Sequence, residues 1–109
     1  MGYVEINSNV YPEIAYRSIC EYLGIQEADK VINFKKGNIV VEKVQSANED
    51  QKEIVRLFIS LPAEFNSNFV EFANSIACHV KKSVQEMTGM MVETVNVKIS
   101  DVLNETIAE

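Results

Sequence analysis

Two stretches of the sequence place apolar or small residues at helical spacing, and each stretch ends at a glycine. In the first, the residues that share one side are Tyr11, Ile14, Ala15, Ser18, Ile19 and Tyr22. Asn9 is the expected N-cap, Pro12 falls in the first turn, and Gly24 is the expected stop. The pattern predicts a helix of about 13 to 15 residues.

The second helical pattern is longer. Its apolar face consists of Phe69, Phe72, Ala73, Ile76, Ala77, Val80, Val84 and Met87. Asn68 followed by Glu71 resembles a capping box, and Gly89 stands where a helix end needs a left-handed residue. A helix with such a face must pack against something, and the expected partner is a sheet.

The remaining apolar segments have the composition or the alternation of strands. They are residues 3–6, 31–34, 38–45 and 54–61, followed by a strand that starts three residues after Gly89 with Val95, Val97 and Ile99 inward. The turn signal at residues 36–38 predicts a hairpin between the second and third of these strands. Pro62 is expected to end the fourth.

These elements predict the order β-α-β-β-β-α-β and an α+β fold. It is a two-layer sandwich in which two helices pack on one face of a mostly antiparallel sheet. Residues 3–102 form the expected single domain, and residues 103–109 a frayed tail. The polar residues 46–53 are expected to form a solvated loop.

Composition narrows the function classes. The net charge of −6 argues against a nucleic-acid surface and against direct binding to anionic lipid. No apolar run is long enough to span a membrane, and no secretory signal is evident at the N-terminus. Cys20 and Cys78 are therefore expected to be free thiols in the cytoplasm.

Candidate chemistry is sparse. Cys78 and His79 are neighbours on the second helix, where adjacent residues point about 100° apart, so they cannot act as a nucleophile–base pair. Cys20 and Cys78 both lie opposite the apolar stripes and are expected to be exposed, with a redox or metal role as the alternative. The chain has too few Cys and His residues for a structural zinc site and no phosphate-cradling, dinucleotide-binding or G-x-x-G loop. We assign no catalytic, cofactor-binding or metal residues and expect a protein that is not an enzyme and has no cofactor.

Two groups of residues are candidates for an interface. Met87, Met90 and Met91 surround the end of the second helix and either form an adaptable binding surface or fill the core. Tyr16 and Phe58 point away from the apolar sides of their elements, so they either mark an interface or cover a loop or the end of a sheet.

The C-terminal run "VQEMTGMMVETVNVKISDV" resembles the ending of the bacterial alkaline shock protein family, also described as envelope stress response or general stress proteins. The matching residues are Met87, Thr88, Gly89, Val92, Val95, Asn96 and Val97. The opening "YVEINSNVYPEIAYRSICEYLGI" is similar to the family's first strand and helix, with Ile14-Ala15 as its "I-A" pair. The likeness covers residues 3–102.

The resemblance implies a non-enzymatic protein that acts through protein–protein interaction in mainly Gram-positive bacteria. It implies a cytoplasmic protein that an integral membrane partner recruits to the cytoplasmic membrane, with self-association into assemblies in some members. The alternative that the family offers is a regulator of a fatty-acid synthesis enzyme. A sensor using Cys20 or Cys78 is a third hypothesis.

Overall fold

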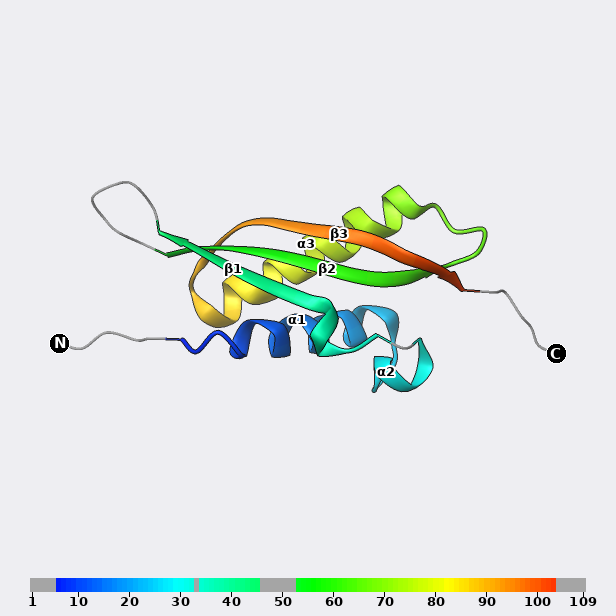
Figure 1. Ribbon diagram of the computed structural model, residues 1–109, viewed down its shortest axis with the longest axis horizontal. Coiled ribbons are helices and arrows are strands. Elements are labelled where there is room, and N and C mark those ends of the chain that lie inside the picture. Colours follow the sequence, from blue (N-terminus) through cyan, green and yellow to red (C-terminus); the bar gives the residue numbers. More distant parts are fainter. Residues whose placement is uncertain (1–5, 33, 46–52, 104–109) are drawn as a thin grey trace.

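The protein folds as a layer of helices against one face of a three-stranded sheet (Figure 1). The computed structural model describes residues 6–32, 34–45 and 53–103. Its elements are α1 (Val10–Leu23), α2 (Ala28–Val31), the 3-10 helix η1 (Lys36–Asn38), β1 (Ile39–Gln45), β2 (Glu53–Glu64), α3 (Phe69–Thr88) and β3 (Met91–Leu103). The predicted α+β class is confirmed.

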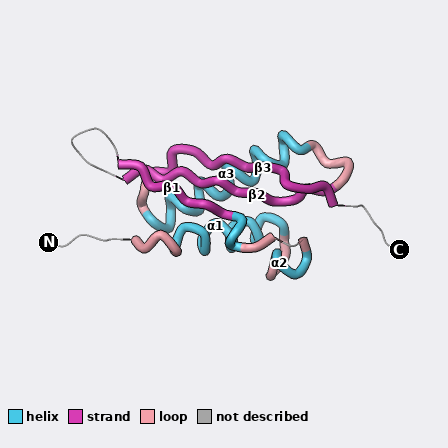
Figure 2. Tube along the Cα trace, in the orientation of Figure 1, coloured by secondary structure: helices cyan, strands magenta, loops and turns pink. Residues whose placement is uncertain are grey.

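The sheet has the order β1-β2-β3 and is mixed. β1 and β2 run antiparallel, with Val41 opposite Leu57. β2 and β3 run parallel, and α3 is the crossover that a parallel pair requires (Figure 2). The sheet is therefore less antiparallel than the sequence predicted.

The core lies between the sheet and the two long helices. Alternate residues of β2 point to this side, and Val55, Leu57, Ile59 and Leu61 are all buried. Ile76, Val80 and Val84 of α3 face them, and the Ser18 hydroxyl of α1 donates to the Ser83 hydroxyl of α3 at 3.0 Å. Each large side chain buried in this way stabilises the fold by roughly 1.5–3 kcal/mol.

Both glycine stops and the start of α3 follow the predicted signals, whereas the Asn9 side chain at the start of α1 makes no capping hydrogen bond. Gly24 and Gly89 both have φ of 74°, in the left-handed region. Around Gly24, the N–H groups of Gly24 and Ile25 donate to the carbonyls of Glu21 and Cys20, which is the Schellman arrangement. At the start of α3, the Asn68 side chain accepts a hydrogen bond from the Glu71 N–H at 3.1 Å, so the predicted N-cap is confirmed.

The predicted strand at residues 31–34 is wrong. Val31 ends the short helix α2, Ile32 lies in a turn, and Phe34 is buried in the core without strand pairing. The Ile32 and Phe34 N–H groups both donate to the Ala28 carbonyl, which folds this apolar run into a turn that delivers Phe34 to the core. Burial of Phe34 thus outweighs the β propensity of the segment, and residues 36–38 form η1 rather than a hairpin turn.

The expectation that Pro62 ends its strand is also wrong, because β2 continues to Glu64. Pairing with β1 stops at Ile59, so beyond that point β2 has a neighbour only on the β3 side. The register with β3 shifts between Leu61 and Ala63. Proline is tolerated at such an irregular, locally unpaired position because its missing N–H is not needed for the ladder.

Other predictions fall wholly or partly outside the described residues. Most of the predicted strand at residues 3–6 does so, and Ile6 itself belongs to no strand. Residues 46–52 of the predicted loop and residues 104–109 of the predicted tail also lie outside, whereas Leu103 is the last residue of β3.

Candidate functional site

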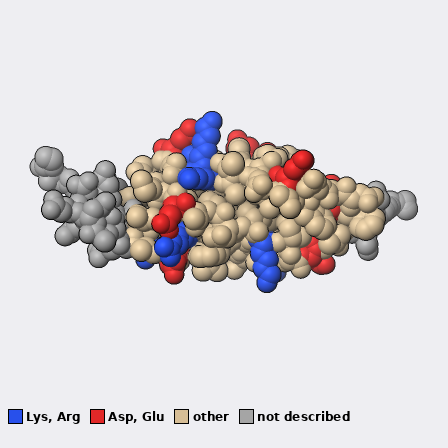
Figure 3. Space-filling view, turned by 90° about the horizontal axis from the view of Figure 1, so that it is seen from above, with Lys and Arg blue, Asp and Glu red and all other residues tan. Residues whose placement is uncertain are grey.

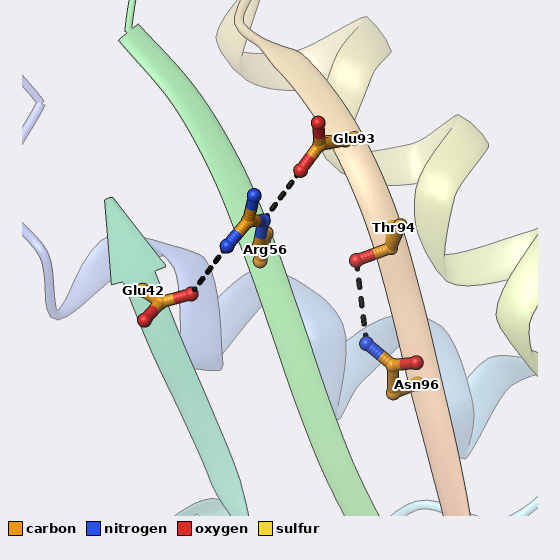
Figure 4. A network of polar contacts seen from close by, with 5 residues as sticks. All are labelled: Glu42, Arg56, Glu93, Thr94 and Asn96. Carbon is orange, nitrogen blue, oxygen red and sulfur yellow. Dashed lines mark hydrogen bonds and ion pairs between the residues drawn. The ribbon is translucent and has the colours of Figure 1, made fainter. Parts of the chain in front are cut away.

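The face of the sheet that points away from the helices is not covered by any element among the described residues. In Figure 4 its side chains project from the strands, with the helices behind the sheet. Alternation along β2 puts Ile54, Arg56, Phe58 and Ser60 on this side, since the intervening residues are buried. We call it the open sheet face, and its side chains form rows across the strands.

The first row of the open sheet face is apolar. Val44 is paired with Ile54, and Ile54 is paired with Met91, so their side chains lie side by side on this face. Val44 and Ile54 are partly buried, and Met91 is 59% exposed. An apolar row on an uncovered face is unusual, because outward positions of a solvated sheet are normally polar.

The second row is charged and internally paired. Arg56 on β2 forms ion pairs with Glu93 on β3 and with Glu42 on β1, the latter at 3.2 Å (Figure 4). The hydrogen bonds that the Arg56 guanidinium donates to Glu93 and then to Glu42 raise the pKa of Arg56, so the guanidinium stays charged. Next to this row, the Asn96 amide donates to the Thr94 hydroxyl at 3.2 Å. The row links all three strands across the face.

The third row is apolar on β1 and β2 and polar on β3. Val40 is paired with Phe58, and Phe58 is paired with Asn96. Val40 is 57% and Phe58 40% exposed. The exposed position that the sequence predicted for Phe58 is therefore confirmed.

Tyr16, the other aromatic side chain singled out from the sequence, has a structural contact instead. Its ring stacks on Phe34 with the centroids 5.8 Å apart, and Lys36 lies over the ring. Tyr16 therefore covers the turn that carries Phe34.

The three methionines near the end of α3 divide between the two predicted roles, filling the core and forming an exposed surface. Met90 packs against the core, whereas Met87 is 72% exposed and Met91 belongs to the open sheet face. Neither role accounts for all of them.

The cysteines also differ. Cys78 is exposed as expected, but Cys20 is buried, so the expectation for Cys20 is wrong. The reason is that α1 packs against both α3 and β1, and the consecutive residues Ser18, Ile19 and Cys20 are all buried. The buried arc of α1 is wider than the single stripe used to place Cys20.

His79 lies at the contact between α1 and α3. Its Nε2 atom is 3.4 Å from the Glu21 carboxylate, and its ring lies 5.5 Å from that of Tyr22. Cys78 is on a different side of the helix and is exposed. Within the described part of the chain, no group of three or more His, Cys, Asp or Glu side chains is placed to hold a metal ion.

A wide depression of about 700 Å³ lies between α1 and η1. Three of its charged residues form one cluster, because Glu13 forms ion pairs with both Arg17 and Lys36. Hydrogen bonds from Lys36 and then Arg17 hold the pKa of Glu13 below its usual value. The Glu13 carboxylate in this depression is therefore already occupied by basic side chains of the protein itself.

Sequence reasoning identified Phe58 but missed most of the open sheet face. Val40, Val44 and Ile54 look like ordinary strand residues in the sequence, and only their pairing places them together. A signal was present in β1 and β2, where apolar residues occupy consecutive positions rather than strictly alternate ones.

No helix among the described residues combines the length and apolar content needed to cross a membrane. No curated protein and no solved structure matches the chain. A family model of the alkaline shock proteins, described as having a cell envelope-related function, matches residues 1–104. With a match over nearly all of its length, the chain belongs to the alkaline shock protein family, as the resemblance of its sequence implied.

Proposed function

We propose that this protein is a non-enzymatic component of the envelope stress response that acts by binding other proteins. In this proposal it is cytoplasmic, and an integral membrane partner recruits it to the membrane. The observation that carries the proposal is the open sheet face, with Val40 and Phe58 exposed beside one another, in a chain whose family is related to the cell envelope.

The topology of the sheet supports an interaction at this face. Parallel strands occur mainly in sheets that are covered on both faces, and here β2 and β3 are parallel while the helices cover one face. A partner protein on the open sheet face would complete the burial of the Val44, Ile54 and Met91 row. Exposed apolar groups rimmed by polar ones are typical of protein-binding surfaces.

The charged row would contribute specificity. Because Arg56 is already paired with Glu42 and Glu93, covering this row does not bury the guanidinium as an isolated charge, and the second carboxylate is left for a donor group of the partner. A partner must still present groups that match a fixed arrangement of two carboxylates around one guanidinium. Such a pattern selects partners more than it adds affinity.

The test is a crosslinking pull-down from the native cells with the tagged protein, with membrane and soluble fractions analysed separately. Phe58→Glu is compared with Val10→Glu, which adds the same charge at the first position of α1, where an acidic residue suits the helix dipole. We expect an integral membrane protein with the wild type and with Val10→Glu, and its loss with Phe58→Glu. Circular dichroism and urea unfolding check that both variants remain folded.

Two outcomes would redirect the proposal. Capture of a soluble fatty-acid synthesis enzyme in place of a membrane protein would indicate a regulatory subunit. Equal capture by all three proteins would remove the open sheet face from the interaction.

A further inference from the structure

We infer that the protein has a second binding site, a groove at the α2 end of the molecule that accepts an apolar peptide segment flanked by Lys or Arg. This inference rests on the proposed function for the source of the segment, a membrane partner. The groove is separate from the open sheet face, because it lies on the helical side at one end of the sheet. It is lined by the apolar side chains Leu23, Ile25, Val31, Ile32, Phe72 and Leu103, and we call it the end groove.

The end groove forms where five elements come together, one of which is the end of β2 at residues 62–64. α1 ends at Leu23, α2 ends at Val31, α3 has just begun at Phe72, and β3 ends at Leu103. Figure 1 shows α2, the beginning of α3 and the end of β3 at the same end of the molecule. Because the site is built from the ends of packed elements, its walls are fixed by the core.

The size of the end groove favours a side-chain anchor over a cofactor. It encloses about 240 Å³, whereas small-molecule sites usually enclose about 300–1,000 Å³. Binding energy at protein interfaces is often concentrated in a few side chains that fill pockets of this kind.

Exposed apolar side chains extend the end groove outward. Val31 is 62% and Phe65 is 56% exposed. The Phe65 N–H donates to the Leu103 carbonyl at 3.0 Å, which places Phe65 directly beside the groove. Phe69, also exposed, precedes Phe72 by one helical turn. A peptide seated in the groove would cover these residues as well.

The charge around the end groove selects the occupant. Glu64 lines it, Glu71 precedes Phe72, and Asp101 lies two residues before Leu103. All three are exposed, and none has a salt bridge to another described residue. The nearest basic side chain in α2, Lys30, is paired with Glu27 at 3.2 Å. On the face shown in Figure 3, one basic side chain projects right of centre, and only acidic side chains are visible farther toward this end.

The negative charge around the end groove disfavours two possible occupants, the C-terminal residues 104–109 and a second copy of the protein. Residues 104–109 carry Glu105 and Glu109 and no Lys or Arg. A second copy has a net charge of −6. A basic segment with an apolar centre complements both the lining and the rim. Lys and Arg are enriched in the cytoplasmic segments next to membrane helices, so an integral membrane partner would supply such a segment.

The test is a titration of the full-length protein, followed by amide chemical shifts. The probe is the peptide Lys-Arg-Leu-Phe-Leu-Arg-Lys with blocked ends, and the matched control is Glu-Asp-Leu-Phe-Leu-Asp-Glu. We expect the basic peptide to shift the Val31, Ile32, Phe72 and Leu103 signals, with binding weakened by added salt. The acidic peptide is expected to leave them unchanged. Equal shifts with both peptides, or none at the groove, would refute the inference.

Two exposed valines provide a matched pair of variants. Val31→Lys removes an apolar wall of the end groove and adds a positive charge, whereas Val40→Lys makes the same change on the open sheet face. We expect Val31→Lys to weaken the peptide by about tenfold, the loss of roughly 1.4 kcal/mol that truncation of an interface anchor produces. Val40→Lys should leave peptide binding unchanged. An equal loss with both variants would contradict a site at the end groove.

Further arms test the other occupants and separate the two proposals. Groove signals that move when residues 104–109 are deleted, or with protein concentration alone, would identify the chain's own residues or a second copy and overturn the inference. In the cellular pull-down, normal capture of a membrane protein by Val31→Lys would refute the end groove and leave the proposed function standing. If the wild type captures no membrane protein, the proposed function fails, and the peptide titration still decides whether the groove binds basic segments.

Discussion

Replacing Gly89 with alanine tests how the helix α3 is converted into the strand β3. Gly89 has φ of 74°, and its N–H donates to the Gln85 carbonyl at 2.9 Å. A Cβ atom added there would meet nothing within 4 Å, so steric contact with neighbours contributes nothing to the cost. The cost in the folded state is therefore the backbone strain of an L-residue in the left-handed region, about 1–2 kcal/mol.

Alanine also makes the unfolded chain less flexible, which offsets the strain by about 0.4–1 kcal/mol. The net expectation is a loss of about 1 kcal/mol, or a fall in Tm of roughly 4–8 °C for a domain near this size. Urea unfolding followed by circular dichroism measures it, with an unchanged m value showing that the compactness of the two states is the same.

Two further variants serve as controls for the backbone strain at Gly89. Gly37→Ala also meets open space but has no left-handed φ, so it should be neutral or slightly stabilising. Gly89→Asn should lose less than Gly89→Ala, because Asn adopts the left-handed region more readily. A Gly89→Ala variant as stable as the wild type, or a Gly37→Ala variant equally destabilised, would refute the strain argument.

Three further predictions concern the cap, a salt bridge and the thiols. Asn68→Ala should destabilise the protein by about 0.5–2 kcal/mol in urea unfolding, because the Glu71 N–H loses its acceptor, whereas the exposed helical change Asn74→Ala should not; equal losses would argue against the cap. The pKa of Glu13 is lowered in the folded state by Lys36 and then Arg17, so its contribution to stability is present above pH 4.5 and is lost as the pH falls below that value. The stability difference between wild type and Glu13→Gln should therefore shrink on acidification, and a difference that does not depend on pH would contradict this. Cys78 should react rapidly with a thiol reagent in the native protein and Cys20 only on unfolding, as mass spectrometry of the labelled peptides would show; comparable rates would contradict the burial of Cys20.

The sequence predicted the elements whose signals are local. The length of α3 followed from its apolar spacing, and its ends from Asn68 and Gly89, because caps depend on neighbouring residues. The inward side of β3 followed from alternation in the same way, because Val95 and Val97 pack against the core and Ile99 is partly buried.

The errors lie where distant contacts decide the local structure. Residues 31–34 have strand-like composition, but the buried site that Phe34 fills becomes apparent only when α1 and its Tyr16 ring are in place. β2 can continue through Pro62 because its pairing with β1 reaches only to Ile59. The residues around Pro62 give no sign of where that pairing stops. Cys20 is buried because α1 has two packing partners rather than one.

The candidate surfaces were harder to predict than the fold. Phe58 could be identified because it interrupts an alternating pattern. The end groove could not, because its walls come from five elements that extend from α1 to the end of β3. Its acidic rim is equally dispersed, with Glu64, Glu71 and Asp101 on three different segments.

The most direct test of the proposed function is photocrosslinking in living cells from two positions of similar exposure. A photoreactive phenylalanine analogue replaces Phe58 on the open sheet face in one strain and Val10 at the start of α1 in another, where the exposed fractions are 40% and 37%. We expect the Phe58 position to crosslink an integral membrane protein and the Val10 position to give no such product. Crosslinks to a membrane protein from Val10 alone, or from neither position, would contradict the claim that the open sheet face recruits this protein to the envelope.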